Sequence, residues 1–470
     1  MRKKIIPFLM VNSVIWVFLL AKLFVISSKE IIPNNWLENC VSLIFLIFVF
    51  QTLQMILLKF KLSNFIVVYS ILQFVFLYGR IVLKYFNLDS INGWNLFAYY
   101  SPMLVYQSVF FSLCFSQGIF LGFLIWGFPK LQYRTNTLTK NKKYSSYQMK
   151  IVGIAVLLIC LPFLAYTNYA TILAQKSSEY VAVPQISGYI VAVSQVFFAG
   201  IIMLIISPSL SRKKTNLLVA MYFIYGLIYM ILSADRRQII ITFIVTALVY
   251  FDSYKVKINV KKIILILLVS LLLLNLLTSI SSVRMDGITL DNVMKQFYFQ
   301  LTSENIFVKT ISEFGNTFFT LPSAMTFYPE QLHFLYGKTY IFSFLVAIPG
   351  ISQFIFTNAF NSTLIFGILQ NLDGNPLGGS LPQDLYVNFG ISGILLSPIL
   401  ALILSKFLNR KENPTKFDQA MYFISFYLLL NFVRTGFLES VRSYLYAIIL
   451  VYFLFFIVHS LTMSSPSEMK

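Results

Sequence analysis

Apolar runs of about 20 residues recur along the whole chain, and they constrain its fold more than any other feature. Each run is long enough to cross a bilayer as an α-helix, because the hydrocarbon core is about 30 Å thick and a helix rises about 1.5 Å per residue. Only 11% of the 470 residues are charged and 58% are apolar, which excludes a soluble domain or a disordered chain. The sequence therefore predicts an all-α, polytopic integral membrane protein.

We expect about twelve transmembrane helices. The apolar runs that define them cover residues 5–27, 36–58, 64–86, 104–127, 150–170, 188–207, 216–234, 238–252, 261–280, 384–405, 417–434 and 442–461. This pattern divides the chain into a nine-helix N-terminal bundle (1–280), a large extracytoplasmic loop (281–383) and a three-helix C-terminal region (384–470).

Lys and Arg residues fall mainly in alternate connections between these runs. With the N-terminus in the cytoplasm, 23 of the 36 basic residues lie in cytoplasmic segments and 11 in outer segments. Cytoplasmic loops of membrane proteins are enriched in Lys and Arg, so we expect both termini in the cytoplasm. The net charge of +19 is then mostly a topology signal, and we expect no nucleic-acid partner. The first apolar run follows Arg2-Lys3-Lys4 and contains Lys22, which indicates a retained first helix rather than a signal peptide.

The outer loop of roughly 100 residues is not uniformly polar. Residues 306–321 place Phe307, Ile311 and Phe314 at helical spacing, whereas 340–349 and 352–371 are apolar stretches in a Gly- and Pro-containing loop. We expect these stretches to form short interfacial or re-entrant helices at the outer leaflet, where membrane lipid would be a partner.

Arginine is concentrated on the predicted outer side. It supplies five of the 11 basic residues there but only four of the 23 on the cytoplasmic side. The five are Arg236, Arg237, Arg284, Arg434 and Arg442, all in tight turns or at the ends of apolar runs. The planar guanidinium grips phosphate oxygens bidentately, and charges at membrane depth are usually functional. Pairing with Asp235 or Glu439 would explain a single Arg, but the set of five predicts a site for a lipid-linked phosphate or pyrophosphate.

Two acidic residues are candidates for a catalytic base near such a site. Glu313 lies in the apolar 306–321 stretch, and Asp384 begins an apolar run. Either carboxylate could instead be a helix cap or an ion-pair partner, because an acid at a helix N-terminus is favoured by the helix dipole. Cys40, Cys114 and Cys160 all lie in apolar runs without a metal-binding spacing, so we expect no metal site and no cofactor.

Several short motifs occur in a fixed order between residues 230 and 445. They are Asp235-Arg236-Arg237, Glu313-Phe314-Gly315-Asn316-Thr317, Tyr336-Gly337-Lys338-Thr339-Tyr340, Gly378-Gly379-Ser380, Tyr386-Val387-Asn388-Phe389-Gly390 and Arg434-Thr435-Gly436. Together with the dozen apolar runs and the single large outer loop, they resemble the Wzy-type polymerases that join O-antigen and capsule repeat units. Asp384 stands where the family pattern has Glu.

The resemblance implies a GT-C-like, metal-independent inverting glycosyltransferase in the bacterial inner membrane. Its active site would lie on the extracytoplasmic face. It would transfer a growing glycan from undecaprenyl pyrophosphate to the non-reducing end of a new lipid-linked repeat unit, so donor and acceptor are both lipid-linked oligosaccharides. The resemblance also places Lys338 and Tyr340 among the substrate-binding residues and suggests a chain-length regulator protein as a partner.

Other functions fit parts of the sequence. A lipid-linked oligosaccharide flippase would need polar residues at the middle of the membrane and often contains repeats, neither of which is evident here. An O-antigen ligase-type enzyme shares the outer-face chemistry. A metal-dependent GT-C enzyme would resemble a pattern with paired acids in the first outer loop, where Glu30 stands alone. A non-enzymatic scaffold leaves the outer arginines unexplained.

Overall fold

The chain is described by a computed structural model. It describes residues 2–29, 31–89, 95–127, 143–176, 186–233, 237–256, 275, 279, 290–303, 306–351, 369, 372–374, 377–408 and 415–463. Within these ranges every regular element is a helix and no strand is present. The helices form two compact units, each assembled from segments that are far apart in the sequence.

Eight helical stretches in these ranges are long and apolar enough to cross a membrane. They cover Ile5–Lys29, Trp36–Leu57, Phe65–Tyr85, Pro102–Trp126, Tyr147–Ala174, Gly188–Ile206, Leu381–Phe407 and Ser440–Thr462. Each coincides with one of the predicted runs, so the prediction of a polytopic helical membrane protein is confirmed.

Three further predicted runs are helical but shorter or less apolar. They correspond to α9 (Arg212–Ser233), α10 (Arg237–Tyr254) and α20 (Lys416–Leu430). The run at 261–280 lies almost entirely outside the described residues. The total of about twelve spans therefore stays a prediction.

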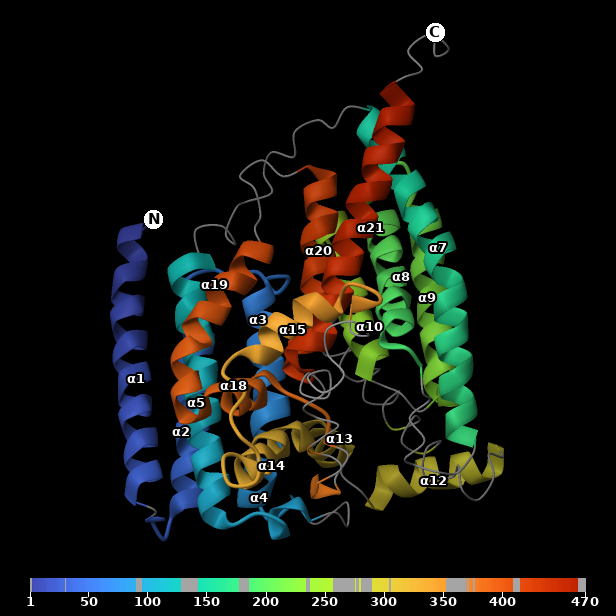
Figure 1. Ribbon diagram of the computed structural model, residues 1–470. Coiled ribbons are helices and arrows are strands. Elements are labelled where there is room, and N and C mark those ends of the chain that lie inside the picture. Colours follow the sequence, from blue (N-terminus) through green and yellow to red (C-terminus); the bar gives the residue numbers. More distant parts are fainter. Residues whose placement is uncertain are drawn as a thin grey trace. The chain divides into compact units, whose positions relative to one another are not determined.

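The first unit comprises Met1–Tyr133, Val308–Asn409 and Leu429–Val441. Its long helices are α1 (Arg2–Lys29), α2 (Trp36–Leu57), the α3–α4 pair (Phe65–Gln73 and Gly79–Tyr85), α5 (Pro102–Gly122) and α19 (Ser397–Phe407). Helix α5 is at the centre and is buried along nearly its whole length. It contacts α1, α2 and α19, which lie beside it in Figure 1.

Small residues allow α5 and α19 to approach closely. A Cβ at Gly122 would lie 2.6 Å from Ala401 Cβ, and a Cβ at Gly118 would collide with Ser397. Glycines four residues apart are a common feature of tightly packed membrane helices. Amide side chains add hydrogen bonds across the bundle: Asn12 Nδ2 donates to Gln54 Oε1 at 2.8 Å, and Gln117 Nε2 donates to Asn12 Oδ1 at 2.7 Å.

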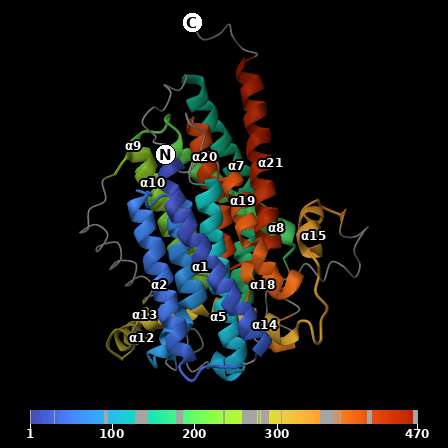
Figure 2. The ribbon, with the colours of Figure 1, turned by 90° about the vertical axis from the view of Figure 1, so that its left-hand side faces the viewer.

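The predicted 306–321 helix is broken and partly buried. Helix α13 (Ile306–Gly315) ends at Gly315, a 3-10 turn follows at Asn316–Phe319, and α14 (Thr320–Phe327) continues. Phe318 and Phe319 are fully buried, so this part of the predicted outer loop packs inside the first unit, and the choice between the re-entrant and the interfacial alternative stays a prediction. Helix α14 and α18 (Leu381–Phe389) both pack on α5, and they lie close together in Figure 2.

Helix α15 (Lys338–Val346) has the opposite character. It buries Thr339, Ser343 and Val346 and exposes Ile341 and Phe344, so two of its large apolar side chains face outward, as side chains at a lipid interface do. The predicted apolar stretch at 352–371 lies outside the described residues, apart from Leu369.

The second unit comprises Arg134–Phe307, Arg410–Leu428 and Arg442–Lys470. It contains α7 (Lys143–Lys176), α8 (Gly188–Ile206), α9, α10, α12 (Leu290–Ser303), most of α20 and most of α21 (Phe437–Met463). Helices α7, α8 and α9 contact one another and run side by side in Figure 1. Gly153 and Gly200 allow the closest approach, because a Cβ at Gly200 would lie 2.9 Å from the carbonyl oxygen of Gly153.

Candidate functional site

The first unit brings three of the sequence motifs together around Asp384. This residue lies in the first turn of α18 and is buried. Its Oδ2 accepts a hydrogen bond of 2.6 Å from the backbone N–H of Phe437, the first residue of α21. A helix N-terminus has unpaired N–H groups and a partial positive charge, so the carboxylate acts as its cap.

The glycines of two motifs permit this contact. A Cβ at Gly436 would lie 3.1 Å from Asp384 Oδ2, and a Cβ at Gly379 would lie 3.1 Å from the backbone nitrogen of Gly436. Ser380 begins α18 with a capping box, in which its side chain accepts from Gln383 N and Gln383 Oε1 accepts from Ser380 N. The Gly378–Ser380 and Arg434–Gly436 motifs are therefore packed backbone against backbone beside Asp384.

Asn388 connects α18 to the start of α15. Its Nδ2 donates to Thr339 Oγ1 and to the Asp384 carbonyl oxygen, both at 2.7 Å, and its Oδ1 accepts from Gly337 N at 3.0 Å. Gly337 has a φ of +81°, which favours glycine at this turn. These bonds hold the Tyr336–Tyr340 motif against the Tyr386–Gly390 motif.

Tyr340 reaches the same region with its phenol. The ring lies between Phe389, with ring centroids 6.3 Å apart, and Phe437, at 4.8 Å. Burial, together with the nearby Asp384 carboxylate, raises the pKa of Tyr340 well above its ordinary value, so the phenol stays protonated. Its hydroxyl is buried and has no hydrogen-bond partner among the described residues. An unpartnered buried hydroxyl is costly, which indicates that water or a ligand contacts it.

Two further unpartnered polar atoms belong to the Glu313–Thr317 motif. Asn316 Oδ1 and Thr317 Oγ1 are buried, and neither has a hydrogen-bond partner within the described ranges. Thr320, one turn later, donates to the Thr317 carbonyl at 2.9 Å and lies 2.7 Å from Ser380 Oγ. The end of this motif is thus connected to the start of α18. We call Asp384, Tyr340, Asn316, Thr317 and Arg434 the motif cluster.

Glu313 lies on α13 and is half-buried. Its neighbour Ser312 accepts a 2.6 Å hydrogen bond from Arg80 Nη1, and Arg80 Nε lies 2.6 Å from Asp89 Oδ1. Arg80 is therefore a buried structural connection between α4 and α13 rather than a residue facing a ligand.

The structure describes the side chains of only two of the five outer arginines, Arg434 and Arg442. Arg434 is half-buried, two residues before Gly436 in the first unit. Arg442 is half-buried on α21 in the second unit, with its guanidinium carbon 4.9 Å from the ring centre of Tyr189. A Cβ at Gly188 would collide with Arg442 Nη1, so the guanidinium lies against the N-terminus of α8. Arg236 and Arg284 lie outside the described residues, and the side chain of Arg237 does too, although its backbone begins α10.

Lys338 is exposed at the start of α15, two residues from Tyr340. In the part of the chain that the structure describes, no group of three or more His, Cys, Asp or Glu side chains is arranged to hold a metal ion.

Several residues in and beside the motif cluster lie inside the sequence motifs without an expected role of their own. Ser380, Asn388 and Gly436 stand inside separate motifs, and only the structure shows that they meet at α18, where Thr320 also links Thr317 to Ser380. One sequence feature could have pointed to these residues: they are polar, yet they stand inside or beside apolar stretches, where polar side chains are usually functional.

A family model described as O-antigen polysaccharide polymerase Wzy matches residues 8–465 of the chain. No curated protein and no solved structure matches it significantly.

Proposed function

Since the chain belongs to the O-antigen polysaccharide polymerase Wzy family, a family of membrane enzymes that polymerise polysaccharide repeat units, we propose a specific reaction for it. It joins oligosaccharide repeat units carried on undecaprenyl pyrophosphate, on the outer face of the bacterial inner membrane. It transfers the growing glycan to the non-reducing end of a new lipid-linked unit by a GT-C-like, metal-independent inverting mechanism. Both termini are cytoplasmic, and a chain-length regulator is an expected partner.

In this reaction a hydroxyl of the acceptor sugar attacks the anomeric carbon of the donor glycan. A new carbon–oxygen bond forms as the bond from the anomeric carbon to the pyrophosphate oxygen breaks, and the electron pair leaves with undecaprenyl pyrophosphate. The proton of the acceptor hydroxyl passes to a carboxylate. Preorganised guanidinium groups stabilise the negative charge that develops on the leaving group.

We assign Arg236, Arg237, Arg284, Arg434 and Arg442 to the two lipid pyrophosphates. The position of Arg442 at the N-terminus of α8 supports this, because a guanidinium and the positive end of a helix dipole together favour an anion. The position of Arg434 next to Gly436 supports it as well, since the Asp384–Phe437 hydrogen bond fixes the adjoining backbone.

The observation that carries the proposal is the motif cluster itself. Three buried polar atoms in two motifs of a polymerase family have no partner among the described residues. Hydrogen bonds from Thr320 to Ser380 and from Asn388 to Thr339 connect these two motifs to α18, and such atoms suit the hydroxyl groups of an acceptor sugar. Within this cluster we assign Asp384 a positioning role, because its carboxylate caps α21. Glu313 is then the candidate base, and Lys338 and Tyr340 contact substrate.

Replacement of Arg434 by Lys tests the proposal, because Lys keeps the charge but loses the bidentate fork. We expect loss of long polymer, with accumulation of single lipid-linked repeat units on the outer leaflet and unchanged protein level. The readout is chromatography of lipid-linked glycans and gel analysis of polymer length. Arg212→Lys is the matched control, since Arg212 lies at the start of α9 on the predicted cytoplasmic side.

Wild-type chain length in both Arg434→Lys and Arg284→Lys would remove the pyrophosphate assignment. In a strain that lacks the protein, accumulation of repeat units on the inner leaflet would instead indicate a flippase.

A further inference from the structure

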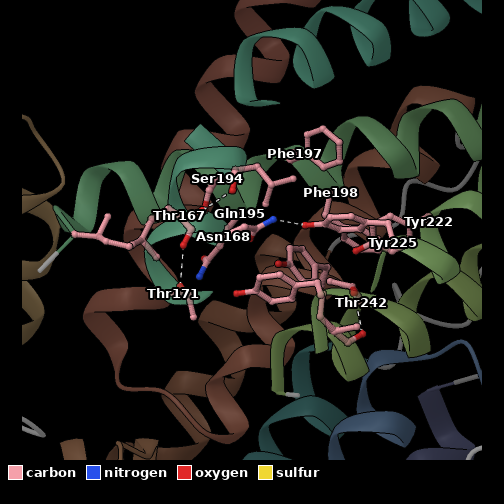
Figure 3. Close-up of a pocket in the computed structure, with 16 residues that line it drawn as sticks. Thr167, Asn168, Thr171, Ser194, Gln195, Phe197, Phe198, Tyr222, Tyr225 and Thr242 are labelled. Carbon is pink, nitrogen blue, oxygen red and sulfur yellow. Dashed lines mark hydrogen bonds between the residues drawn. The ribbon is translucent and has the colours of Figure 1, made fainter. Parts of the chain in front are cut away.

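The second unit contains a cavity of about 150 Å³ that the motif cluster does not use. Five helices line it: α7, α8, α9, α10 and α20. Successive helices in this set run in alternating directions along the predicted topology, and each contributes residues from its predicted outer half. Asn168 and Thr171 near the end of α7, and Ser194 and Gln195 near the start of α8, are examples that Figure 3 labels. The cavity therefore lies in the outer half of the unit.

No charged side chain lines this cavity. None of its 16 lining residues, all of them described, is Asp, Glu, Lys or Arg. A phosphate or another ion would be poorly stabilised in such a lining, because a desolvated charge requires a countercharge. The cavity is also unlike a dry apolar void, since hydroxyl and amide groups occupy much of its wall.

The hydroxyl groups of the wall are arranged to accept hydrogen bonds. Thr171 donates to the Thr167 carbonyl at 2.8 Å, Ser194 to the Val191 carbonyl at 2.7 Å and Thr242 to the Ile239 carbonyl at 2.9 Å. The Thr242 side chain also forms a hydrogen bond with the Tyr222 phenol, which leaves one lone pair on its oxygen. Each proton is thus used within its own helix, and the hydroxyl oxygen keeps a lone pair for another donor. A ligand that fits these oxygens must carry several O–H or N–H groups.

The amide groups complete the polar side of the wall. Asn168 Nδ2 donates to Tyr225 Oη at 2.6 Å, which fixes the orientation of both side chains. The Gln195 side chain also lines the cavity, and its amide can both donate and accept hydrogen bonds.

Aromatic rings form the other side of the wall. Phe198 lies against Tyr427, with ring centroids 4.6 Å apart, and against Tyr222 at 5.4 Å. Rings provide a flat apolar surface, and the C–H face of a sugar ring is complementary to such a surface. Pockets that combine aromatic walls with a few oriented polar groups are typical of small-molecule sites.

We infer that this cavity binds one uncharged sugar ring of the glycan that the enzyme handles. A cavity of about 150 Å³ holds one six-membered ring, as an engineered cavity of that size holds benzene. A sugar also supplies the hydroxyl donors that the Thr and Ser oxygens require, which benzene does not. The identity of the glycan rests on the proposed function, whereas binding of a neutral sugar ring rests on the cavity alone.

Calorimetric titration of the purified full chain in lipid nanodiscs tests this inference. The probe is the repeat-unit oligosaccharide released from the host's own polymer and freed of its lipid pyrophosphate. Thr242→Val and Gln195→Leu keep side-chain shape but remove one hydrogen-bonding group each. We expect each to weaken oligosaccharide binding about 3- to 10-fold, the range for one hydrogen bond, and to leave inorganic pyrophosphate binding unchanged.

Thr246→Val is the matched control. Thr246 lies one turn beyond Thr242 on α10, is fully buried, and donates to the Thr242 carbonyl at 2.7 Å, but it does not line the cavity. Its substitution should leave binding unchanged. If Gln195→Leu does not fold, Thr242→Val alone decides the result.

Three results would overturn the inference. They are no binding of the oligosaccharide by the wild type, equal affinity in wild type and Thr242→Val, and equal loss in Thr242→Val and Thr246→Val. The second result would mean that the cavity holds water only. Failure of the proposed function can be distinguished from failure of this inference. The first would appear as normal polymer length in Arg434→Lys, whereas the titration would still measure sugar binding in the cavity.

Discussion

At the scale of single residues, the informative groups are buried polar atoms that have no hydrogen-bond partner in the described parts of the chain. The Tyr340 hydroxyl is the clearest case, since it lies beside the Asp384 carboxylate and its pKa is raised by burial. In contrast, the Tyr386 hydroxyl donates to the Tyr328 carbonyl at 3.2 Å. The two tyrosines belong to neighbouring motifs. Among the described residues only the Tyr340 hydroxyl lacks a hydrogen-bond partner, so it is the one that we expect to contact substrate.

This difference predicts opposite behaviour for two matched substitutions. Tyr340→Phe should leave the melting temperature unchanged or slightly higher, because it removes an unsatisfied buried group, but should shorten or abolish polymer. Tyr386→Phe should cost about 1–3 kcal/mol of stability, because the Tyr328 carbonyl loses its donor. Thermal unfolding in detergent and gel analysis of polymer provide the two readouts. Normal polymer in Tyr340→Phe would show that its hydroxyl does not contact substrate.

At the scale of elements, Asp384 joins two helices that are adjacent in space but far apart in the chain. It belongs to the first turn of α18 and caps the first residue of α21. The sequence pointed to this acid because it begins an apolar run, and left open whether it is a cap or a base. Its hydrogen bond to Phe437 N–H favours the cap, because this oxygen already accepts from the N-terminus of α21.

Replacement of Asp384 separates the two roles. Asp384→Asn keeps an oxygen that can accept from Phe437 N–H, so we expect a loss of about 1 kcal/mol and near-normal polymer. Asp384→Leu leaves the N–H unsatisfied and should cost about 1–3 kcal/mol and abolish polymer. Melting temperature and polymer length are measured for both variants. Asp418→Asn, at the exposed start of α20, serves as the control.

If Asp384→Asn abolished polymer while its melting temperature matched the wild type, Asp384 would be the base and the positioning role would be wrong.

At the scale of the whole molecule, each unit is assembled from distant segments, and the membrane topology decides which ends of the helices face the substrate. The native cysteines make this topology measurable. Cys40, Cys114 and Cys160 are all fully buried, so a thiol reagent should not reach them in the folded protein.

Cysteines introduced at exposed positions should therefore report their side of the membrane. Tyr99 is 61% exposed before α5, on the predicted outer side, and Leu62 is 54% exposed between α2 and α3, on the predicted cytoplasmic side. A membrane-impermeant maleimide should label Tyr99→Cys in spheroplasts and Leu62→Cys only after permeabilisation. The unmodified chain should stay unlabelled, and the reverse pattern would invert the orientation.

The sequence alone determined the helical membrane class, the positions of eight spans and the family resemblance, because bilayer thickness imposes a length and an apolarity that are visible residue by residue. It also identified α15 as too short to span.

Only the tertiary structure decided that Gly379, Asp384 and Gly436 meet, that the segment after Gly315 is buried, and that uncharged side chains of five helices enclose a cavity. The physical reason is that these arrangements depend on which helix faces touch. In lipid, apolar composition is similar on all faces of a helix, so periodicity does not reveal those contacts.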